Sequence, residues 1–446
     1  TKKSNTGKVA KALGIGVIKI ITGFKDVQLT YTESNGTLLP GFTPKPELIG
    51  NRMSDMAPGL GFVFGSQEDI RYEAARNGWL SADTLLNNAY ITRLTRDLTG
   101  RATYEPFPEF RIEFNAEKKE SFGHQEYFKA NAEGVFSPSG EQERGSFSIS
   151  FFSLKTAFVK DGDENISPTF EEFKNNRRVI AARLGSMNPA STGINDTTGY
   201  PVGYGPGSQE VLIPAFLAAY SGQSATSVSL SAFPKIPIPN WRFTYTGLSK
   251  LPFLKDHFKQ FNIGHSYRST YAVGSYITNI DFLESMGFPS SFDVAGNFIP
   301  KNRIEIITIS EQFAPLFNID MTWNNSLLTR SLSLSFVNNQ LTEVSNNEVI
   351  IGLGYRFKDV KLNLSSGGRR QQLKSDLNIK ADLSIRDNKT VLRRLDEAIN
   401  QISTGNRMVS INTSADYVIN QRFNIRLFFD KTITNPFVSN QFDNST

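Results

Sequence analysis

The stretch SDLNIKADLSIRDNKT, residues 375–390, alternates between apolar and polar side chains along most of its length. Successive side chains of an extended strand point to opposite faces, so this pattern predicts a β-strand with one apolar and one polar face. The apolar members are Leu377, Ile379, Ala381, Leu383 and Ile385. The strand raises one question, which is whether its apolar face contacts a protein core or lipid.

Similar alternating runs recur along most of the chain. They cover residues 27–31, 110–116, 147–151, 228–232, 261–267, 317–323, 332–336, 349–357, 409–417 and 423–429. Runs of about 10 alternating residues are typical of outer-membrane strands, whereas a soluble sandwich has turn signals every 8–12 residues or so. The connection at 185–207 is rich in Gly, Pro, Ser, Thr and Asn, and loops of this length are uncommon in compact soluble domains.

The sequence therefore predicts an all-β fold, an antiparallel segment of a very large transmembrane β-barrel. Residues 1–446 are expected to be part of one barrel without a separate soluble domain, and 160–240 to be a long insertion of loops and short helices. The stretch 390–403 is predicted to be a hairpin that turns near 396–400. A tight turn at 418–422 is expected on the periplasmic side, so the strand at 423–434 runs outward and a final returning strand is expected to be missing.

Two helices are predicted inside the insertion. The first has Ser167 as its N-cap and ends at Gly185. The second has Ser208 as its N-cap and ends at Gly222. Because the second helix is nearly all apolar, it is expected to be buried inside the barrel or against a partner. The proline-rich stretch FPKIPIPNW (233–241) is predicted to be an extended strap.

The two faces of the C-terminal strands supply the predicted site residues. The polar side chains expected to line a lumen are Arg356, Lys380, Asp382, Arg386, Asn412, Asp416 and Arg426. The apolar side chains expected to contact lipid are Leu377, Ile379, Leu383, Ile385, Ile411, Ile425 and Leu427. Because the polar set carries both signs of charge, it favours a wide water-filled passage over an ion-selective filter.

The composition gives no indication of catalytic chemistry. The chain has 0 cysteines, which excludes disulfides and thiolate sites, and its 3 histidines form no ligand motif. No enzyme activity, catalytic residue, cofactor or metal site is predicted. The net charge of +5 is modest and its basic residues are scattered, so no nucleic-acid partner is expected.

The N-terminal stretch shows neither a signal-peptide pattern nor a transmembrane helix. Its longest apolar run, residues 10–21, is short and broken by glycines and a lysine. The chain is therefore expected either to be cytosolic or to be a fragment whose beginning lies elsewhere.

Long motifs of the chain resemble one known family. SDLNIKADLSIRDNKTVLRRLDEAINQISTGNRMVSINTSADYVINQRFNIRLFFDKTITNPFVSNQF (375–442) closely resembles the end of the SprA/Sov family, the outer-membrane translocons of the Bacteroidetes type IX secretion system. DVQLTYTESNGTLLPGF (26–42), TYEPFPEFRIEFN (103–115) and QEVLIPAFLAAYSG (209–222) resemble the same family. The resemblance covers essentially the whole chain, and since family members are several times longer, it implies that residues 1–446 are the C-terminal part of one large β-barrel.

The resemblance implies a function and a set of partners. It implies an integral outer-membrane barrel that conducts folded cargo and supports gliding motility. The implied partners are the rest of its own barrel, a PorV-type shuttle barrel at a lateral opening, a periplasmic plug protein, secreted cargo with a C-terminal sorting domain, and membrane lipid or lipopolysaccharide. Two alternatives stay open, a TonB-dependent nutrient receptor, which needs a plug domain in its own chain, and a soluble all-β adhesin.

Overall fold

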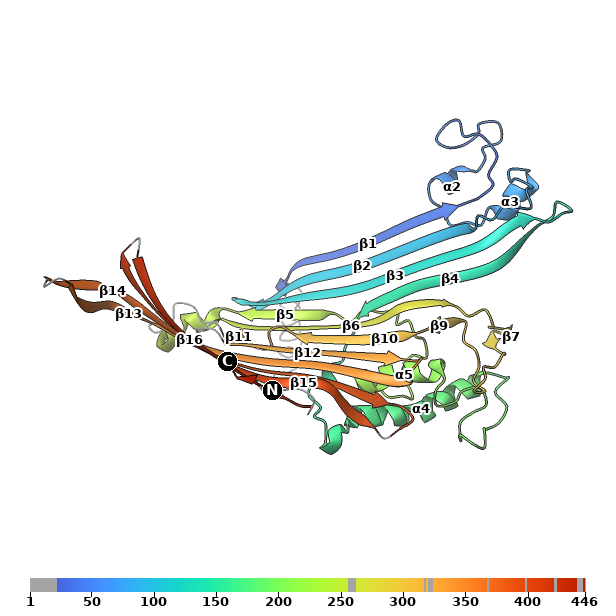
Figure 1. The fold of residues 1–446 in the computed structure, drawn as a ribbon. Helices are drawn as coiled ribbons and strands as arrows, with labels where there is room; N and C mark the ends of the chain where they lie inside the picture. Colours follow the sequence, from blue (N-terminus) through green and yellow to red (C-terminus); the bar gives the residue numbers. More distant parts are fainter. Residues whose placement is uncertain are drawn as a thin grey trace, which may run out of the picture.

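One antiparallel sheet dominates the molecule (Figure 1). The structure is a computed structural model, and it describes residues 22–255, 262–316, 318–319, 324–366, 369–397, 399–420, 423–438 and 444–445. The strands lie in the order β1-β2-β3-β4-β6-β10-β12-β13-β14-β15-β16-β17. Their bounds are β1 (Phe24–Leu38), β2 (Tyr90–Phe107), β3 (Phe110–Ala130), β4 (Phe136–Ser150), β6 (Ile263–Thr278), β10 (Ile306–Phe313), β12 (Asn324–Ser335), β13 (Gln340–Ser366), β14 (Arg369–Arg394), β15 (Asn400–Asn420), β16 (Phe423–Pro436) and β17 (Asn444–Ser445). The prediction of an all-β, antiparallel fold is confirmed.

Shorter elements complete the sheet and its connections. The short strands are β5 (Asn240–Tyr245), β7 (Glu284–Ser285), β8 (Phe288–Pro289), β9 (Asn302–Ile304) and β11 (Asn318–Ile319). The helices are α2 (Leu60–Val63), α3 (Arg71–Arg76), α4 (Pro168–Met187), α5 (Gln209–Ser221) and α6 (Pro252–Lys255), and the 3-10 helices are η1 (Leu154–Thr156), η2 (Asp163–Asn165) and η3 (Gly247–Lys250). Among the described residues, none of these helices has both the length and the apolar character that a membrane span requires.

From β4 to β16, strand register divides the sheet into two chemically different faces. Ile149 pairs with Tyr271, Tyr271 with Ile309, and Ile309 with Leu332. On the later strands the same face carries Ile351, which pairs with Leu383. Directly paired residues project to the same side of a sheet, so these side chains form one continuous surface, which we call the apolar face. The opposite face, which we call the polar face, carries Ser148, Thr308, Ser333 and Asp382 at the alternate positions.

The main hydrophobic core lies between the apolar face and the helices α4 and α5. Figure 1 shows both helices lying beside the sheet near β10 and β12, while β13 and β14 continue as an arm to the left. The buried sheet residues of this core are Phe147, Ile149, Phe151, Tyr271, Val273, Ile307, Ile309, Leu332, Leu334 and Leu341. A smaller core packs the connection between β1 and β2 around Trp79, Tyr90 and Phe128.

The connections and edges of the C-terminal strands follow the predicted hairpins. β14 ends at Arg394 and β15 begins at Asn400, and the next connection joins Asn420 to Phe423. Among the described residues, β1 pairs only with β2, while β16 pairs with β15 and the two-residue β17. The sheet therefore has two free edges within the described part of the chain.

Two local predictions are wrong. Helix α4 does not end at Gly185 but continues to Met187. Gly185 instead allows Pro201 to pack closely on the helix, since an added Cβ would lie 2.7 Å from Pro201 Cβ. Residues 228–232 form no strand. The carbonyl of Val228 accepts a hydrogen bond from Arg183 Nη1 on α4 (3.0 Å) instead of one from a neighbouring strand. Of the predicted run at 317–323 only 318–319 are described, and residues 10–21 lie outside the described part of the chain.

Candidate functional site

The long insertion leaves and re-enters the sheet at a single strand position. β4 ends at Ser150 and β5 begins at Asn240, and both strands pair with β3 on one side and β6 on the other. Side chains bridge the break: the Glu117 N–H donates to Ser150 Oγ (2.8 Å), and the Ser269 N–H donates to Asn240 Oδ1 (2.7 Å). Residues 151–239, which we call the insertion, are thus an excursion from an otherwise continuous sheet.

Helix α5 is the buried centre of the insertion. Every residue from Val211 to Ser221 is buried. Gly222 ends the helix in a left-handed conformation (φ 65°), which glycine adopts without steric penalty. The predicted burial of this apolar helix is confirmed, and its cover consists of α4 on one side and the apolar face on the other.

Aromatic contacts join the two helices. The rings of Phe173 on α4 and Phe216 on α5 lie 5.7 Å apart in an edge-to-face arrangement, and Phe216 also contacts Tyr220 at 4.8 Å. Fully burying one such side chain stabilises a fold by about 1.5–3 kcal/mol. The opposite side of α4 is polar, with Glu172, Asn175 and Arg178 exposed, so this helix covers α5 and faces water.

A buried ionic cluster fixes the first part of the insertion to the sheet. It consists of Arg330 on β12, Glu343 on β13, Arg393 on β14 and Asp161 of the insertion. Arg393 Nη2 lies 2.9 Å from both Glu343 Oε2 and Asp161 Oδ2, and Arg330 Nε lies 2.8 Å from Glu343 Oε1. Arg330 also donates to the carbonyl of Thr156 (2.9 Å). Lys389 Nζ lies 3.6 Å from Asp161 Oδ2 as well, so three cations surround the two carboxylates, and such pairing is what burial of charge requires.

A hydrogen-bond network around Glu311 holds the start of the insertion. Ser153 donates to Glu311 Oε1 (2.8 Å), and the hydroxyl of Tyr267 donates to the same oxygen (2.9 Å). The Oγ atoms of Ser153 and Ser269 lie 2.9 Å apart. Neither this network nor the ionic cluster has a sequence motif, because its members come from separate strands and meet only through strand register.

One group of side chains could hold a cation. Ligand atoms of His124, Glu141 and Glu143 lie within 4.8 Å of one another. Lys301 Nζ already lies 3.2 Å from Glu143 Oε2, so a positive charge is present beside the group. The sequence analysis missed this grouping because the histidine and the carboxylates belong to two strands and show no ligand spacing.

The two predicted sets of site residues lie on opposite faces of the sheet. Leu383 pairs with Ile411, and the apolar set shares its face with α5. Asp382 pairs with Asn412, and the polar set lies on the other face. Arg386 of the polar set pairs with Glu348 at 2.9 Å, and ion pairs also join Arg356 to Asp376 and Arg426 to Asp416. The assignment of one face to lipid and the other to a lumen stays a prediction.

No family model matches the chain, and no curated protein matches it.

Replacing Arg393 with alanine should release the insertion from the sheet. The change removes the fully buried guanidinium that joins Glu343 to Asp161, leaving Arg330 beside Glu343 and Lys389 beside Asp161, and breaking a buried ion pair costs about 3–5 kcal/mol. The matched control is Arg394→Ala, since the Arg394 side chain is 55% exposed and its ion pair among the described residues is with nearby Glu397. Removing such a surface pair is expected to cost about 0–1 kcal/mol. Limited proteolysis at residues 188–207 measures the release, and equal protection of both variants would contradict the assigned role.

The carboxyl group of Glu210 should make docking of the insertion depend on pH. Glu210 Oε2 is buried and has no hydrogen-bond partner among the described residues, and burial raises the pKa of this carboxyl to about 7. In the undocked insertion Glu210 loses its proton near the ordinary pKa of a glutamate, whereas in the docked insertion it keeps the proton until about pH 7. The free energy of docking therefore becomes less favourable as the pH rises toward 7, and it stays less favourable above that pH.

Glu210→Gln should remove this dependence and stabilise the docked insertion at pH 8, by at most about 3 kcal/mol. The measurement is the urea concentration at which the insertion becomes sensitive to protease, at pH 5 and pH 8. Glu172→Gln, on the exposed side of α4, is the control and should leave the pH profile unchanged. A Glu210→Gln profile identical to that of the unaltered protein would refute the role of this carboxyl.

Proposed function

We propose that the chain forms part of the wall of an outer-membrane β-barrel that serves as the protein-conducting translocon of a type IX secretion system. The observation that supports a membrane wall is an exposed apolar band on the apolar face. On β13 it consists of Val349, Ile351, Leu353, Tyr355 and Phe357, which are between 44% and 67% exposed. Soluble proteins rarely expose contiguous apolar surface of this extent.

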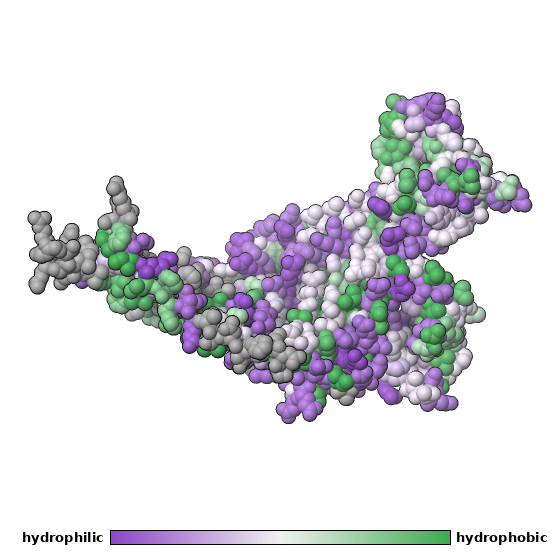
Figure 2. Space-filling model, in the orientation of Figure 1, coloured by the Kyte–Doolittle hydropathy of each residue, from purple (hydrophilic) through white to green (hydrophobic). Residues whose placement is uncertain are grey.

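The band continues across the neighbouring strands and has a suitable length. Residues 377–385 on β14 pair with 349–357 on β13, and β15 and β16 add Ile411, Ile425 and Leu427. A strand needs about 9–11 residues to cross the hydrocarbon layer, and the run at 349–357 is close to this. Figure 2 shows apolar side chains gathered on the described part of the arm formed by β13 and β14.

The insertion lies on the same face as the band but farther along the strands. It contacts β13 at Leu341 and Glu343 and β14 at Arg393, whereas the band begins at Val349. With the band in hydrocarbon, the insertion would lie in water beside the membrane, on the outer side of the wall. That position supports a partner-docking role for residues 185–240, with a PorV-type barrel, a periplasmic plug and sorted cargo as the proposed partners.

The polar face suits a wide conduit. Its charges are of both signs, and several of them are paired with one another, as Arg386 is with Glu348. A nutrient receptor of the TonB-dependent kind would need a plug on this face. The insertion instead packs on the apolar face, which favours the translocon over the receptor.

Leu383→Arg should hinder membrane assembly, because a cation in the middle of the hydrocarbon layer costs roughly 2–4 kcal/mol. Ser384→Arg should be tolerated, since Ser384 lies on the polar face and donates to Glu348 Oε1 (3.1 Å). The measurement is the amount of each variant in purified outer membranes. Equal amounts of the two variants would contradict the assignment of faces.

Replacing residues 154–236 with a short Gly/Ser linker should leave the protein in the membrane and impair secretion. The ends of the insertion are adjacent, since the Ile238 N–H donates to the carbonyl of Ser150 (3.1 Å), so the sheet can continue without it. The measurement is the fraction of cargo with type IX sorting domains that reaches the cell surface.

The control is a strain depleted of the whole protein, in which the same cargo should be retained. Normal surface display of sorted cargo, together with loss of uptake of a small nutrient, would contradict the translocon proposal. The receptor alternative would then take its place.

A further inference from the structure

Two arginines face each other across a glycine on the polar face. Arg93 on β2 pairs with Gly123 on β3, and Gly123 pairs with Arg144 on β4. The three residues therefore form one row across the sheet and project to the same side. Neighbouring strands lie about 4.7–4.9 Å apart, so the two arginine Cα atoms are separated by about 10 Å. Since glycine has no side chain, the space between the two side chains is open.

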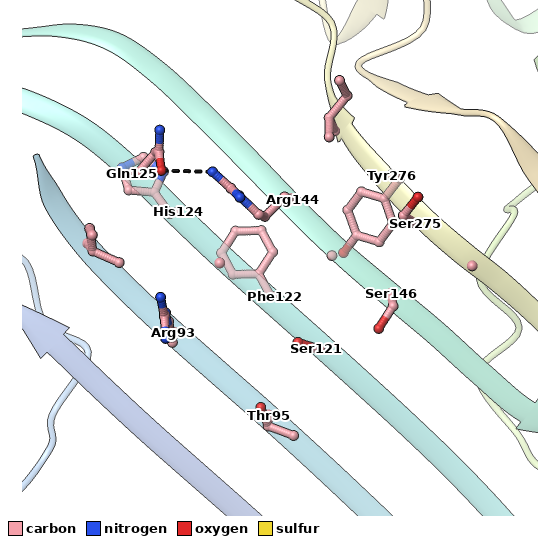
Figure 3. A pocket seen from close by; sticks show the side chains of 15 residues that line it. Arg93, Thr95, Ser121, Phe122, His124, Gln125, Arg144, Ser146, Ser275 and Tyr276 are labelled. Atoms are coloured by element: carbon pink, nitrogen blue, oxygen red, sulfur yellow. Dashed lines mark hydrogen bonds between the residues drawn. The ribbon is translucent and has the colours of Figure 1, made fainter.

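Neutral hydrogen-bonding groups surround this row. On one side of it Ser121 pairs with Thr95 and with Ser146, which supplies three hydroxyl groups. On the other side lie the amides of Gln125 and Gln142, which pair with each other. With the exception of Gln142, which lies just outside, these residues line a recess of about 510 Å³, shown in Figure 3. Its size lies within the range of about 300–1,000 Å³ that is usual for small-ligand sites.

The positive charge of the recess is uncompensated. Arg144 Nη2 donates to Gln125 Oε1 (2.9 Å) and Gln142 Oε1 (3.4 Å), so neutral amides orient it. In the described part of the chain, neither Arg93 nor Arg144 forms an ion pair with a carboxylate. No acidic side chain lines the recess. Guanidinium groups without carboxylate partners bind phosphate through paired, charge-assisted hydrogen bonds.

We propose that this recess binds a phosphate group, held by the guanidinium groups of Arg93 and Arg144 above Gly123. The hydroxyls of Ser121, Thr95 and Ser146 would donate to the remaining oxygens. The same chemistry is offered by free inorganic phosphate and by a phosphomonoester lipid headgroup. The proposal concerns a site separate from the insertion and does not depend on the conduction of cargo.

The test is phosphate binding by the full-length protein in detergent, measured by calorimetry at constant ionic strength. Arg93→Gln combined with Arg144→Gln should weaken binding about tenfold or more, because each lost charge-assisted hydrogen bond contributes about 1.5–3 kcal/mol. The matched control is Arg101→Gln, on the same face of β2 but outside the recess, and it should leave the affinity unchanged.

A second variant tests whether phosphate binding needs the open space above Gly123 in addition to the two arginine charges. Gly123→Val keeps both arginines and suits a strand, but its side chain would occupy the gap beside Arg144 Cγ, 3.6 Å from an added Cβ. It should also abolish binding.

A parallel titration with phosphatidic acid vesicles identifies the source of the phosphate. Saturation by inorganic phosphate, or by the vesicles alone, supports the site and names its ligand. Failure of both ligands to saturate the unaltered protein would overturn the proposal, as would equal binding by the double arginine variant.

Discussion

Hydrogen bonding across the break between Ser150 and Asn240 is the constraint on which the rest of the structure depends. A strand that stops inside a sheet leaves backbone groups of both neighbouring strands without partners, and such groups are costly when water is excluded. Here Ser150 Oγ and Asn240 Oδ1 accept the hydrogen bonds that the missing backbone would have accepted. The sheet can therefore stay continuous from β3 to β6 while the chain makes a long excursion.

The excursion divides the apolar face along the length of its strands. Near β10, β12 and the first residues of β13 this face is covered by the insertion, and farther along β13 to β16 it is exposed. The boundary falls on β13 between Glu343, which belongs to the buried ionic cluster, and Val349, which is 47% exposed. One face thus serves as a protein core in one zone and, in our proposal, as a lipid contact in the next. The polar face is available to water along both zones.

Local periodicity explains which features the sequence could predict. Alternation at 375–390 predicted β14, and the apolar character of α5 predicted its burial, because both depend on residues close in the chain. The buried ionic cluster could not be predicted, since Arg330, Glu343 and Arg393 meet only after three strands take their register. The recess between Arg93 and Arg144 was missed for the same reason. The end of α4 was misplaced because the packing of Pro201 on Gly185 is invisible in the sequence.

The most direct test of the account is lipid accessibility along β13. The chain contains 0 cysteines, so single cysteines carrying spin labels can be placed without background. In native outer membranes, oxygen, which dissolves in lipid, should speed the spin relaxation of labels at the positions of Val349, Ile351 and Leu353. A water-soluble nickel chelate should instead speed the relaxation of labels at Ile350 and Gly352. This twofold period is what a membrane wall requires. Equal access of the nickel chelate to both sets, or the opposite phase, would contradict the account.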